Sequence, residues 1–536
     1  MAVITPNTDV ILLKVPLEID ENNQLTFANV TAQYNYFFNL PKLAFDKFTY
    51  QRKDNTIRVP ALVDDLYEYN YVMYRNSNHS NKWFYAFITD LTYVSDQVTA
   101  ISIKTDVWQT WQFELVYKPV FVEREHVNDD TIGSHTVEEN LDLGEYVINS
   151  STTLKPNKTV KDYDNATITG LTFAIVFQVT GLTNGISISS SAFDAAYNGV
   201  FSGLKYFAVT SYSAARDIIT RYDSDTVGNQ IVSIFLAPKE YLSGAKKFGE
   251  LGYNIYIPQD AGTVTTLLDS TTITRPSKLN GYTPKNNKLF TYPFSYIYVT
   301  NNVGINTEFR YEDFASATPK FFIAGALGQG CTTKLCPISY KGYTTNSEVF
   351  EYGVVGAKYP VCAWSSDYYT NWVTQNAVNL GVSAVSGVAG AVISASYGNY
   401  IGAASSLVSS IGGIVAKKYE AKTHPDQAKG NANSSDILIG WQRYFTVDCM
   451  SIRSEIAKII DDYFSMFGYK VNSVKVPNVT GRTNWNFVKT VGCYIQADIP
   501  QTDLAEIKSM FDKGVTFWHN PTTFMDYSQS NAIVTP

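Results

Sequence analysis

Cysteine and histidine are both scarce in this chain of 536 residues, which has five of each. The cysteines are scattered and odd in number: Cys331, Cys336, Cys362, Cys449 and Cys493. A disulfide scaffold is not expected in so large a chain. Cys331 and Cys336 have no second Cys or His pair after them, so the sequence predicts no metal site and no cofactor.

Motifs of the common enzyme classes are also missing. The run from Gly325 to Cys331 begins like a phosphate-binding loop but has cysteine where that loop needs its lysine. There is no Gly-x-Ser-x-Gly elbow and no His-Glu-x-x-His pair. We therefore expect a protein that is not an enzyme.

One dense acidic cluster leaves a catalytic alternative open. Its members are Glu123, Glu125, His126, Asp129, Asp130, His135, Glu138 and Glu139. Paired carboxylates can hydrolyse glycosidic bonds, as a cell-wall-degrading enzyme would. A run of this kind is more often a solvated connector, and we assign residues 126–160 to an acidic connector.

Positive charge is not concentrated anywhere in the sequence. The net charge is −7, and pairs such as Lys246-Lys247 are isolated. Proteins that grip nucleic acid through its phosphates are normally basic somewhere, so no specific nucleic-acid binding is expected. No basic region precedes an apolar stretch at the N-terminus, which predicts synthesis in a cytoplasm without a secretion signal.

One long stretch of the sequence has no charged residues. From Tyr368 to Ala416, 49 residues include no Asp, Glu, Lys, Arg or Pro, in a chain that is 17% charged. At that frequency, such a run arises about once in a hundred shuffled sequences. The run is rich in Gly, Ala, Ser and Val. It predicts a segment that leaves water under some condition, carried by a protein that is otherwise soluble.

This uncharged segment has two halves, Leu380 to Ala395 and Ile401 to Ala416, with a turn-forming stretch between them. Apolar residues recur at steps of three and four, which favours a helical hairpin over the strict alternation of a β-pore stem. The predicted membrane or plug residues are Leu380, Val382, Val385, Val388, Val392, Ile393, Ile401, Leu407, Val408, Ile411, Ile414 and Val415.

Each half is short and only weakly apolar. A helix of about 16 residues is about 24 Å long, against ~30 Å for the hydrocarbon core of a bilayer. A single copy is therefore expected to insert poorly, whereas several copies packed through small residues such as Gly387 and Ala403 would insert better. A hairpin buried in the core of its own subunit is the alternative.

Tyr, Thr and Asn are frequent, and aromatic residues make up 14% of the chain. Tyr and Thr favour strands and Asn favours turns, so we expect an α+β, β-rich multidomain protein. Strands are predicted over Val10–Leu13, Val98–Lys104, Leu171–Val179, Leu204–Val209 and Ile231–Ala237, and a helix over Ser213–Tyr222.

The last hundred residues have the clearest pattern. The predicted order is a strand at Arg443–Cys449, a helix from Ile452 to Phe467, strands at Tyr469–Val476 and Trp485–Ala497, a helix at Asp503–Lys513 and a strand at Val515–Trp518. Ser451 is the predicted N-cap of the first helix, and Gly468 and Gly514 are the predicted stops. The order βαββαβ is typical of a ferredoxin-like unit.

Several longer motifs carry a resemblance to a known family. They are Asp106–Trp111, Phe121–His126, Lys278–Leu289, Ile459–Tyr469, Gly481–Phe487 and Gly514–His519. Through them the chain resembles the tail knob, or distal tail tube, proteins of small short-tailed phages with protein-primed genomes. The similarity covers most of the chain, most strongly in 278–376 and 431–527.

The resemblance implies a homohexameric tube at the tail tip of the virion, next to the proximal tail or collar proteins. Barrel-like domains would line a lumen through which double-stranded DNA passes without specific binding. The apolar loop at 380–416 would plug the tube, leave it on ejection and insert into the host cell membrane as a DNA conduit.

With this resemblance, the chain is expected to divide into six parts. They are a β-rich tube or barrel part (1–125), the acidic connector (126–160), an α+β outer lobe (161–280), a second β-rich tube part (281–366), the hydrophobic hairpin insertion (367–435) and the ferredoxin-like domain (436–536). Two alternatives to the ejection tube stay open: the cell-wall-degrading enzyme, and a receptor-binding protein that uses the aromatic-rich outer lobe.

Overall fold

A computed structural model describes most of the chain, in two compact units. The described residues are 7–48, 55–77, 79–179, 194–197, 200–224, 231–258, 264–328, 332–343, 352–359, 361–363 and 444–534. Unit 1 is Met1–Gly144, Gly281–Phe294 and Arg453–Pro536, and unit 2 is Glu145–Asn280 and Ser295–Ile452. Each unit is therefore assembled from stretches that lie far apart in the sequence, while the predicted domain boundaries stay predictions.

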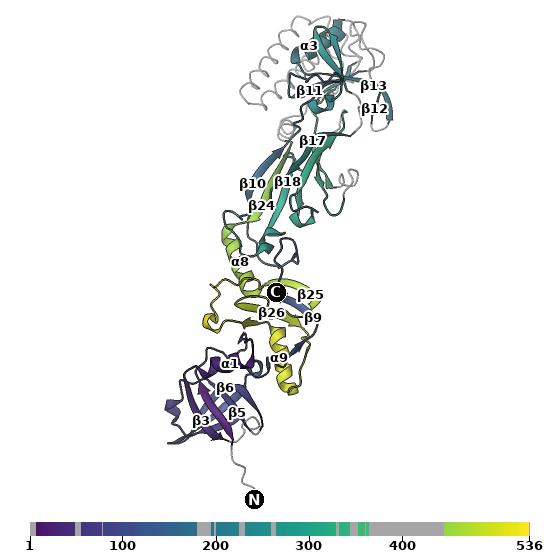
Figure 1. Ribbon diagram of the computed structural model, residues 1–536. Coiled ribbons are helices and arrows are strands. Elements are labelled where there is room, and N and C mark those ends of the chain that lie inside the picture. The colour runs from purple at the N-terminus through teal and green to yellow at the C-terminus, as the bar shows by residue number, and fades with distance from the viewer. Residues whose placement is uncertain are drawn as a thin grey trace, which may run out of the picture. The chain divides into compact units, whose positions relative to one another are not determined.

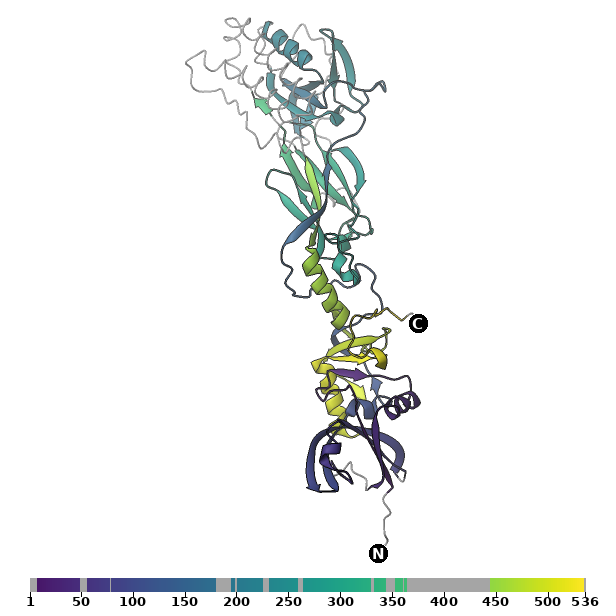
Figure 2. The same cartoon turned by 90° about the vertical axis from the view of Figure 1, so that its left-hand side faces the viewer.

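The N-terminal part of unit 1 is a six-stranded antiparallel sheet (Figures 1 and 2). Its strands, in spatial order, are β3 (Lys42–Phe48), β1 (Thr8–Leu13), β5 (Tyr71–Asn76), β6 (His79–Ser95), β7 (Val98–Thr105) and β4 (Thr56–Val59). The predicted strands at Val10–Leu13 and Val98–Lys104 are confirmed. In β7, Ile101 and Ile103 point into the core, as the period of two requires.

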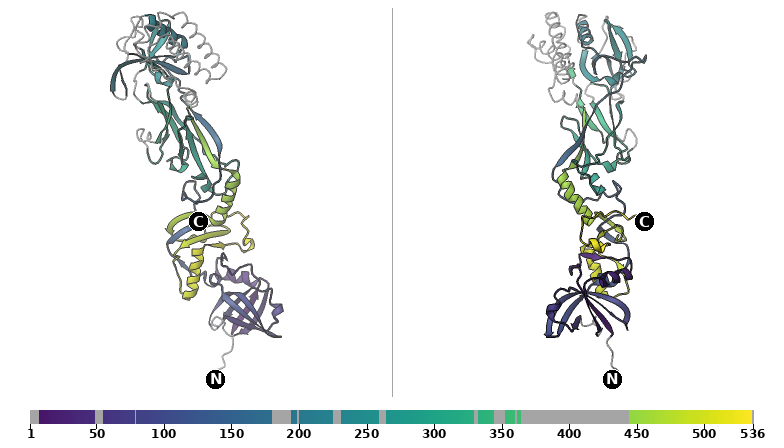
Figure 3. Two further views of the ribbon diagram at one scale, coloured as in Figure 1. Left: turned by 180° about the vertical axis from the view of Figure 1, so that it is seen from behind. Right: turned by 60° about the vertical axis from the view of Figure 1, so that its left-hand side comes forward.

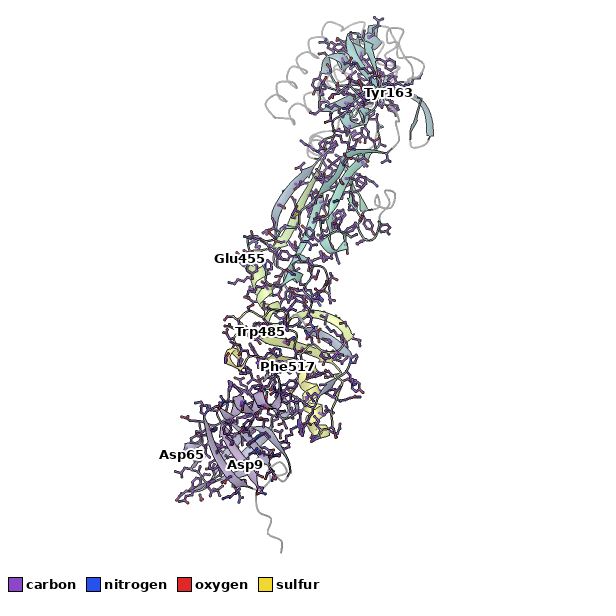
Figure 4. The ribbon with its side chains drawn as sticks, in the orientation of Figure 1. Asp9, Asp65, Tyr163, Glu455, Trp485 and Phe517 are labelled. Carbon is purple, nitrogen blue, oxygen red and sulfur yellow. The ribbon has the colours of Figure 1, made fainter. Side chains whose placement is uncertain are left out.

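A second sheet in unit 1 joins the beginning and the end of the chain. Its order is β2 (Asn23–Leu25), β28 (Val515–Trp518), β26 (Trp485–Val491), β9 (Val120–Glu125) and β25 (Tyr469–Lys475). Trp485 and Phe517, labelled in Figure 4, come from its neighbouring strands β26 and β28. The α-helices among the described residues of this unit are α1 (Val30–Phe38), α2 (Val107–Trp111), α8 (Ser454–Phe467) and α9 (Gln501–Lys513).

The predicted order of elements near the C-terminus is present, but the ferredoxin-like unit is wrong. Its first strand, β24 (Phe445–Ile452), pairs with β10 (Tyr146–Leu154) and β18 (Ser295–Thr300) in unit 2 (Figures 1 and 3). In the sheet of unit 1, β9 takes a central place between β25 and β26. Local sequence predicts that a segment is a strand, whereas its partner depends on which faces can be buried together.

The predictions for the ends of the two C-terminal helices are confirmed for both stops and wrong for the N-cap. Gly468 and Gly514 end α8 and α9 as expected, both with positive φ. Ser451 is not the N-cap of α8, which is Arg453. Ser451 is instead a fully buried residue of β24 that pairs with Ser295. The predicted strand Trp485–Ala497 is also interrupted, because β26 ends at Val491 and the chain turns at Gly492, where φ is 68°.

Unit 2 contains three sheets. One has the order β10, β24, β18 and β19 (Asn306–Phe309). Another has the order β17 (Thr265–Thr272), β20 (Lys320–Gly325), β21 (Thr332–Ile338) and β22 (Val354–Lys358). The largest has the order β15 (Lys246–Glu250), β16 (Tyr253–Ile257), β13 (Val200–Val209), β11 (Phe173–Val179), β14 (Ile231–Pro238) and β23 (Val361–Ala363), and β12 (Asp194–Tyr197) pairs with β13.

One hydrophobic core runs through all three sheets of unit 2. Val447 of β24, Ile323 of β20 and Phe177 of β11 belong to the same buried cluster. The helix α3 (Tyr212–Ser224) lies beside β13 (Figure 1), where a helix was predicted. The described part of the chain is thus rich in strands with few helices, in agreement with the predicted β-rich class.

None of the helices in the described ranges combines the length and the apolar character needed to cross a bilayer. The predicted helical hairpin falls within residues 364–443, outside the described residues.

Candidate functional site: the base of the uncharged segment

The twelve predicted membrane or plug residues all lie between 364 and 443, outside the described residues, so their placement stays a prediction. The strands on either side of this range are described. The chain passes through β22 and β23 before it and enters β24 directly after it. All three strands belong to unit 2, so the described chain on either side of this range belongs to the same compact body.

A turn between β18 and β19 bonds to strands that lie on either side of this range in the sequence. The side-chain amide of Asn301 donates to the carbonyl oxygen of Val355 in β22 at 2.9 Å. The next side chain, Asn302, donates to Oγ1 of Thr446 in β24 at 3.1 Å. Asn301 is fully buried, and its Oδ1 also accepts the backbone N–H groups of Val303 and Ile305, both at 3.0 Å. Neighbouring residues of one turn therefore bond to β22, which is followed by β23 and the range 364–443, and to β24, which follows that range.

The two strands also approach each other directly. A Cβ at Gly356 of β22 would lie 3.2 Å from Cζ of Phe445 and 2.6 Å from Oγ1 of Thr333. Phe445 is fully buried at the start of β24. A side chain at position 356 would force these neighbours apart, so glycine is what allows β22 to pass close to β24.

A group of tyrosines lies near the same base. The hydroxyls of Tyr241 and Tyr359 are 2.6 Å apart and both residues are buried. Tyr444, the first described residue after the segment, has a φ of 49°, which is costly for a bulky side chain. Burial raises the pKa of Tyr444 well above its usual range, with Glu240 and Tyr241 adding to the effect. Burial also raises the pKa of the Glu240 carboxyl to about 7.

Sequence reasoning missed every residue of this base. The run from Asn301 to Gly304 is a recognisable turn signal. Nothing local indicates that its side chains reach strands 54 and 144 residues away. Tyr241, Tyr359 and Tyr444 also lie far apart in the sequence, and nothing local distinguishes them among the 38 tyrosines of the chain.

The acidic cluster is not a free pair of carboxylates. Glu125 is fully buried, with Lys475 Nζ on one carboxylate oxygen and the N–H of Asn478 on the other. Glu139 is likewise buried between Arg124 and Lys288.

Other members of the cluster are also engaged in unit 1. Glu123 pairs with Lys489 at 2.9 Å, and Asp130 accepts a hydrogen bond from the hydroxyl of Tyr469 at 2.5 Å. Charges that are neutralised one by one stabilise a fold, whereas a glycosidase needs two carboxyl groups that face a shared substrate.

The described residues are thus rich in strands, and their buried acidic side chains Glu125 and Glu139 are paired with basic ones. Family comparisons give the class. The model described as the C-terminal domain of the tail knob protein gp9 of Bacillus phage phi29 matches residues 261–532, and the caudoviral major tail protein N-terminus matches residues 6–116. The chain belongs to the phi29 gp9 family of tail knob proteins.

Relatives match nearly the whole chain. It is 25% identical to the tail knob protein gp9 of Bacillus phage phi29 and 27% identical to that of Bacillus phage B103, in each case over 98% of both chains. Among solved structures, the tail knob protein gp12 of bacteriophage C1 has a TM-score of 0.66 at 12% identity, over 98% of this chain and 100% of that one. This last likeness concerns the fold alone.

These comparisons confirm the coarse predictions. The protein is a structural component of a phage tail and resides in the virion. Its relatives are named as tail knob proteins and not as enzymes, in agreement with the prediction that the protein is not an enzyme.

Proposed function

We propose that the protein forms a homohexameric distal tail tube through which double-stranded DNA is ejected. In this proposal, the uncharged segment of each subunit plugs the tube, and on release the six copies insert into the host cell membrane as a conduit. One observation carries the proposal: a tail knob chain has 49 residues without charge between two strands of one body.

Physical reasoning supports the need for several copies. Each half of the segment is about 6 Å shorter than a ~30 Å hydrocarbon core and contains Ser and Gly, so one copy gains little from lipid. Gly and Ala allow close packing of neighbouring helices, which gives an assembly the contacts that a single copy lacks. A ring supplies these copies at one place.

The base of the segment supports the plug in a different way. Asn301 and Asn302 bond β22 and β24, which precede and follow the segment, to one turn of unit 2. The segment can then change its surroundings without unfolding the body that carries it. DNA would pass without specific contacts, since the sequence has no basic cluster and a net charge of −7.

A dye-release experiment tests the membrane step. Purified protein is added to dye-filled vesicles of phosphatidylethanolamine and phosphatidylglycerol, at neutral and at acid pH. Val388→Asp places a charge on the predicted apolar face, and Ser396→Asp places the same charge in the predicted turn. We expect release by the wild type and by S396D, and at least a tenfold loss with V388D, because a buried charge opposes insertion.

The ring is measured on the same samples. Sedimentation velocity and electron microscopy should give a sixfold ring for the wild type and both variants, which separates assembly from insertion. Full release by a variant that lacks residues 380–416 would contradict the membrane role, and a monomer in all samples would contradict the tube. The receptor-binding role of the 161–280 lobe stays a prediction, and binding of that lobe to host cells would support it.

A further inference from the structure

Two histidines lie on either side of β26 in unit 1. His126 follows β9 and is buried, and His519 follows β28 and is half-buried. They contact consecutive residues of β26: His126 is bonded to Phe487, and His519 is bonded to Asn486. All of these residues belong to unit 1, so their contacts are independent of the proposed role of the uncharged segment.

The hydrogen bonds of His126 determine its protonation state. Its Nδ1 accepts the backbone N–H of Phe487 at 2.7 Å, and a backbone N–H can only donate. Nδ1 is therefore without a proton, and Nε2 carries one, which it donates to the carbonyl oxygen of Ser465 in α8 at 3.1 Å. The backbone N–H of His126 in turn donates to the carbonyl of Phe487 at 3.1 Å.

This arrangement makes the ring part of the sheet. The paired strands β9 and β26 end their regular pairing at Glu125 and Val488. Nδ1 of His126 then takes the place of the next backbone acceptor, and Nε2 continues to the last turn of α8. One neutral imidazole thus joins β9, β26 and α8.

The ring of His126 cannot take up a second proton without losing a hydrogen bond. On Nδ1 it would point at the N–H of Phe487 and break the 2.7 Å bond. The charged or titratable groups facing His126 are Arg482, which precedes β26, Arg124 of β9 and His519, and each of them disfavours a positive ring. Burial is the largest effect and, with these charges, lowers the pKa of His126 to about 3, against the opposing hydrogen bond to Ser465.

We propose that His126 is an acid-sensitive latch, whose neutral ring holds the end of β9 to β26 and to α8 and which opens when it takes up a proton. At pH 4.5, a histidine with an ordinary pKa of about 6.5 is protonated about 99% of the time, so the opened form is favoured about a hundredfold more than at pH 7.5. Because the pKa is lowered in the closed form, the latch is stable at neutral pH and loses stability as the pH falls below about 6.5.

His519 provides an internal contrast. Its Nε2 faces Oδ1 of Asn486 at 3.0 Å, and its Nδ1 faces Oγ1 of Thr26 at 2.7 Å. That Oδ1 already accepts the N–H of Arg482, and the Thr26 hydroxyl can instead donate to the carbonyl of Trp518. Burial lowers the pKa of His519 to about 4, but both ring nitrogens face oxygens that can accept a hydrogen bond, so its charged form keeps both bonds.

Hydrogen exchange on the full-length protein tests the latch. Exchange of the β26 amides is measured at pH 7.5 and pH 4.5 and corrected for the intrinsic rate of each amide. We expect opening to increase by about a hundredfold in the wild type. In His126→Asn, whose amide oxygen can still accept from Phe487 but does not titrate, the increase should be less than tenfold. His135→Asn, at a half-buried histidine that is not bonded to β26, should respond like the wild type.

An unchanged hundredfold response in H126N, or an abolished response in H135N alone, would overturn the proposal. Because H126N could fail to fold, a second measurement uses the wild type. Proteins with 13C in the histidine rings report each protonation state by NMR. His126 should remain in its neutral Nε2–H form in the folded protein at pH 4.5, and a folded protein with protonated His126 at pH 5.5 would rule the latch out.

Discussion

At the scale of single residues, the motifs that stand out in the sequence serve packing rather than chemistry. In the motif Asp106–Trp111, the Asp106 carboxylate caps α2 by accepting the N–H of Gln109 at 2.9 Å. The ring of Trp108 lies 4.4 Å from that of Phe517, between centroids, and its Nε1 donates to the carbonyl of Leu25. A specific motif therefore identifies the family through the contacts that build its core.

Asp461 is the residue for which a substitution is most informative. It is fully buried in α8, and its carboxylate accepts hydrogen bonds from the hydroxyl of Tyr282 and the backbone N–H groups of Lys285 and Asn286, at 2.7 to 3.0 Å. These bonds hold the motif Lys278–Leu289 to the helix. A carboxylate with several donors contributes more than a neutral group would.

We expect Asp461→Asn to lower the free energy of unfolding by about 2–4 kcal/mol. The NH2 group of asparagine would replace one carboxylate oxygen and could not accept the hydrogen bonds that this oxygen accepts. The matched control is Asp462→Asn at the adjacent position, where a half-exposed side chain pairs with Lys285 at 3.2 Å. That change should cost less than about 0.5 kcal/mol of unfolding free energy. Urea unfolding measures both variants, and equal effects of D461N and D462N would refute the role of Asp461 in holding this motif to α8.

At the scale of elements, local sequence predicted most of the helices and strands. The stops at Gly468 and Gly514 are correct, because only glycine adopts positive φ there without strain. The prediction that Ser451 caps α8 was wrong. Its hydroxyl could accept a hydrogen bond from a helix N-terminus, but the residue belongs to the strand β24. β24 buries residues on both faces, and a helix cap must be free to bond to the first turn of its helix.

Gly468 and Gly492 provide a matched pair for testing helix termination. Their φ values are 66° and 68°, both in the region that favours glycine. A Cβ at Gly468 would overlap the carbonyl of Glu125, whereas nothing lies within 4 Å of a Cβ at Gly492. Gly492→Ala should cost about 1 kcal/mol from φ alone, and Gly468→Ala about 3 kcal/mol or more. Thermal unfolding should show this order, and similar costs would exclude a tight approach of α8 to β9.

At the scale of the whole molecule, the chain is two bodies that each recruit distant segments. A change inside one body should therefore leave the other unchanged. Asn301→Ala removes a side chain that makes three hydrogen bonds at the base of the uncharged segment, and should destabilise unit 2 by about 2–4 kcal/mol.

Hydrogen exchange locates that effect. The amides of β22 and β24 should exchange faster in N301A, while those of β26 in unit 1 keep their wild-type rates. Gly468→Ala should show the reverse pattern, with faster exchange in β26 and no change in β22. A uniform acceleration in both units after either substitution would mean that the two bodies unfold as one.

The sequence by itself determined the β-rich class, the types of most elements, the glycine stops and the long uncharged segment, since each depends on the properties of neighbouring residues. Only the tertiary structure decided which strands meet. β24 belongs to a sheet of unit 2 and not to the expected one, and β9, near the N-terminus, pairs with β25 and β26 near the C-terminus. Asn301 and Asn302 bond to β22 and β24, which precede and follow the uncharged segment in the sequence. Such pairings depend on which faces can be buried together across the whole chain, and no local pattern contains that information.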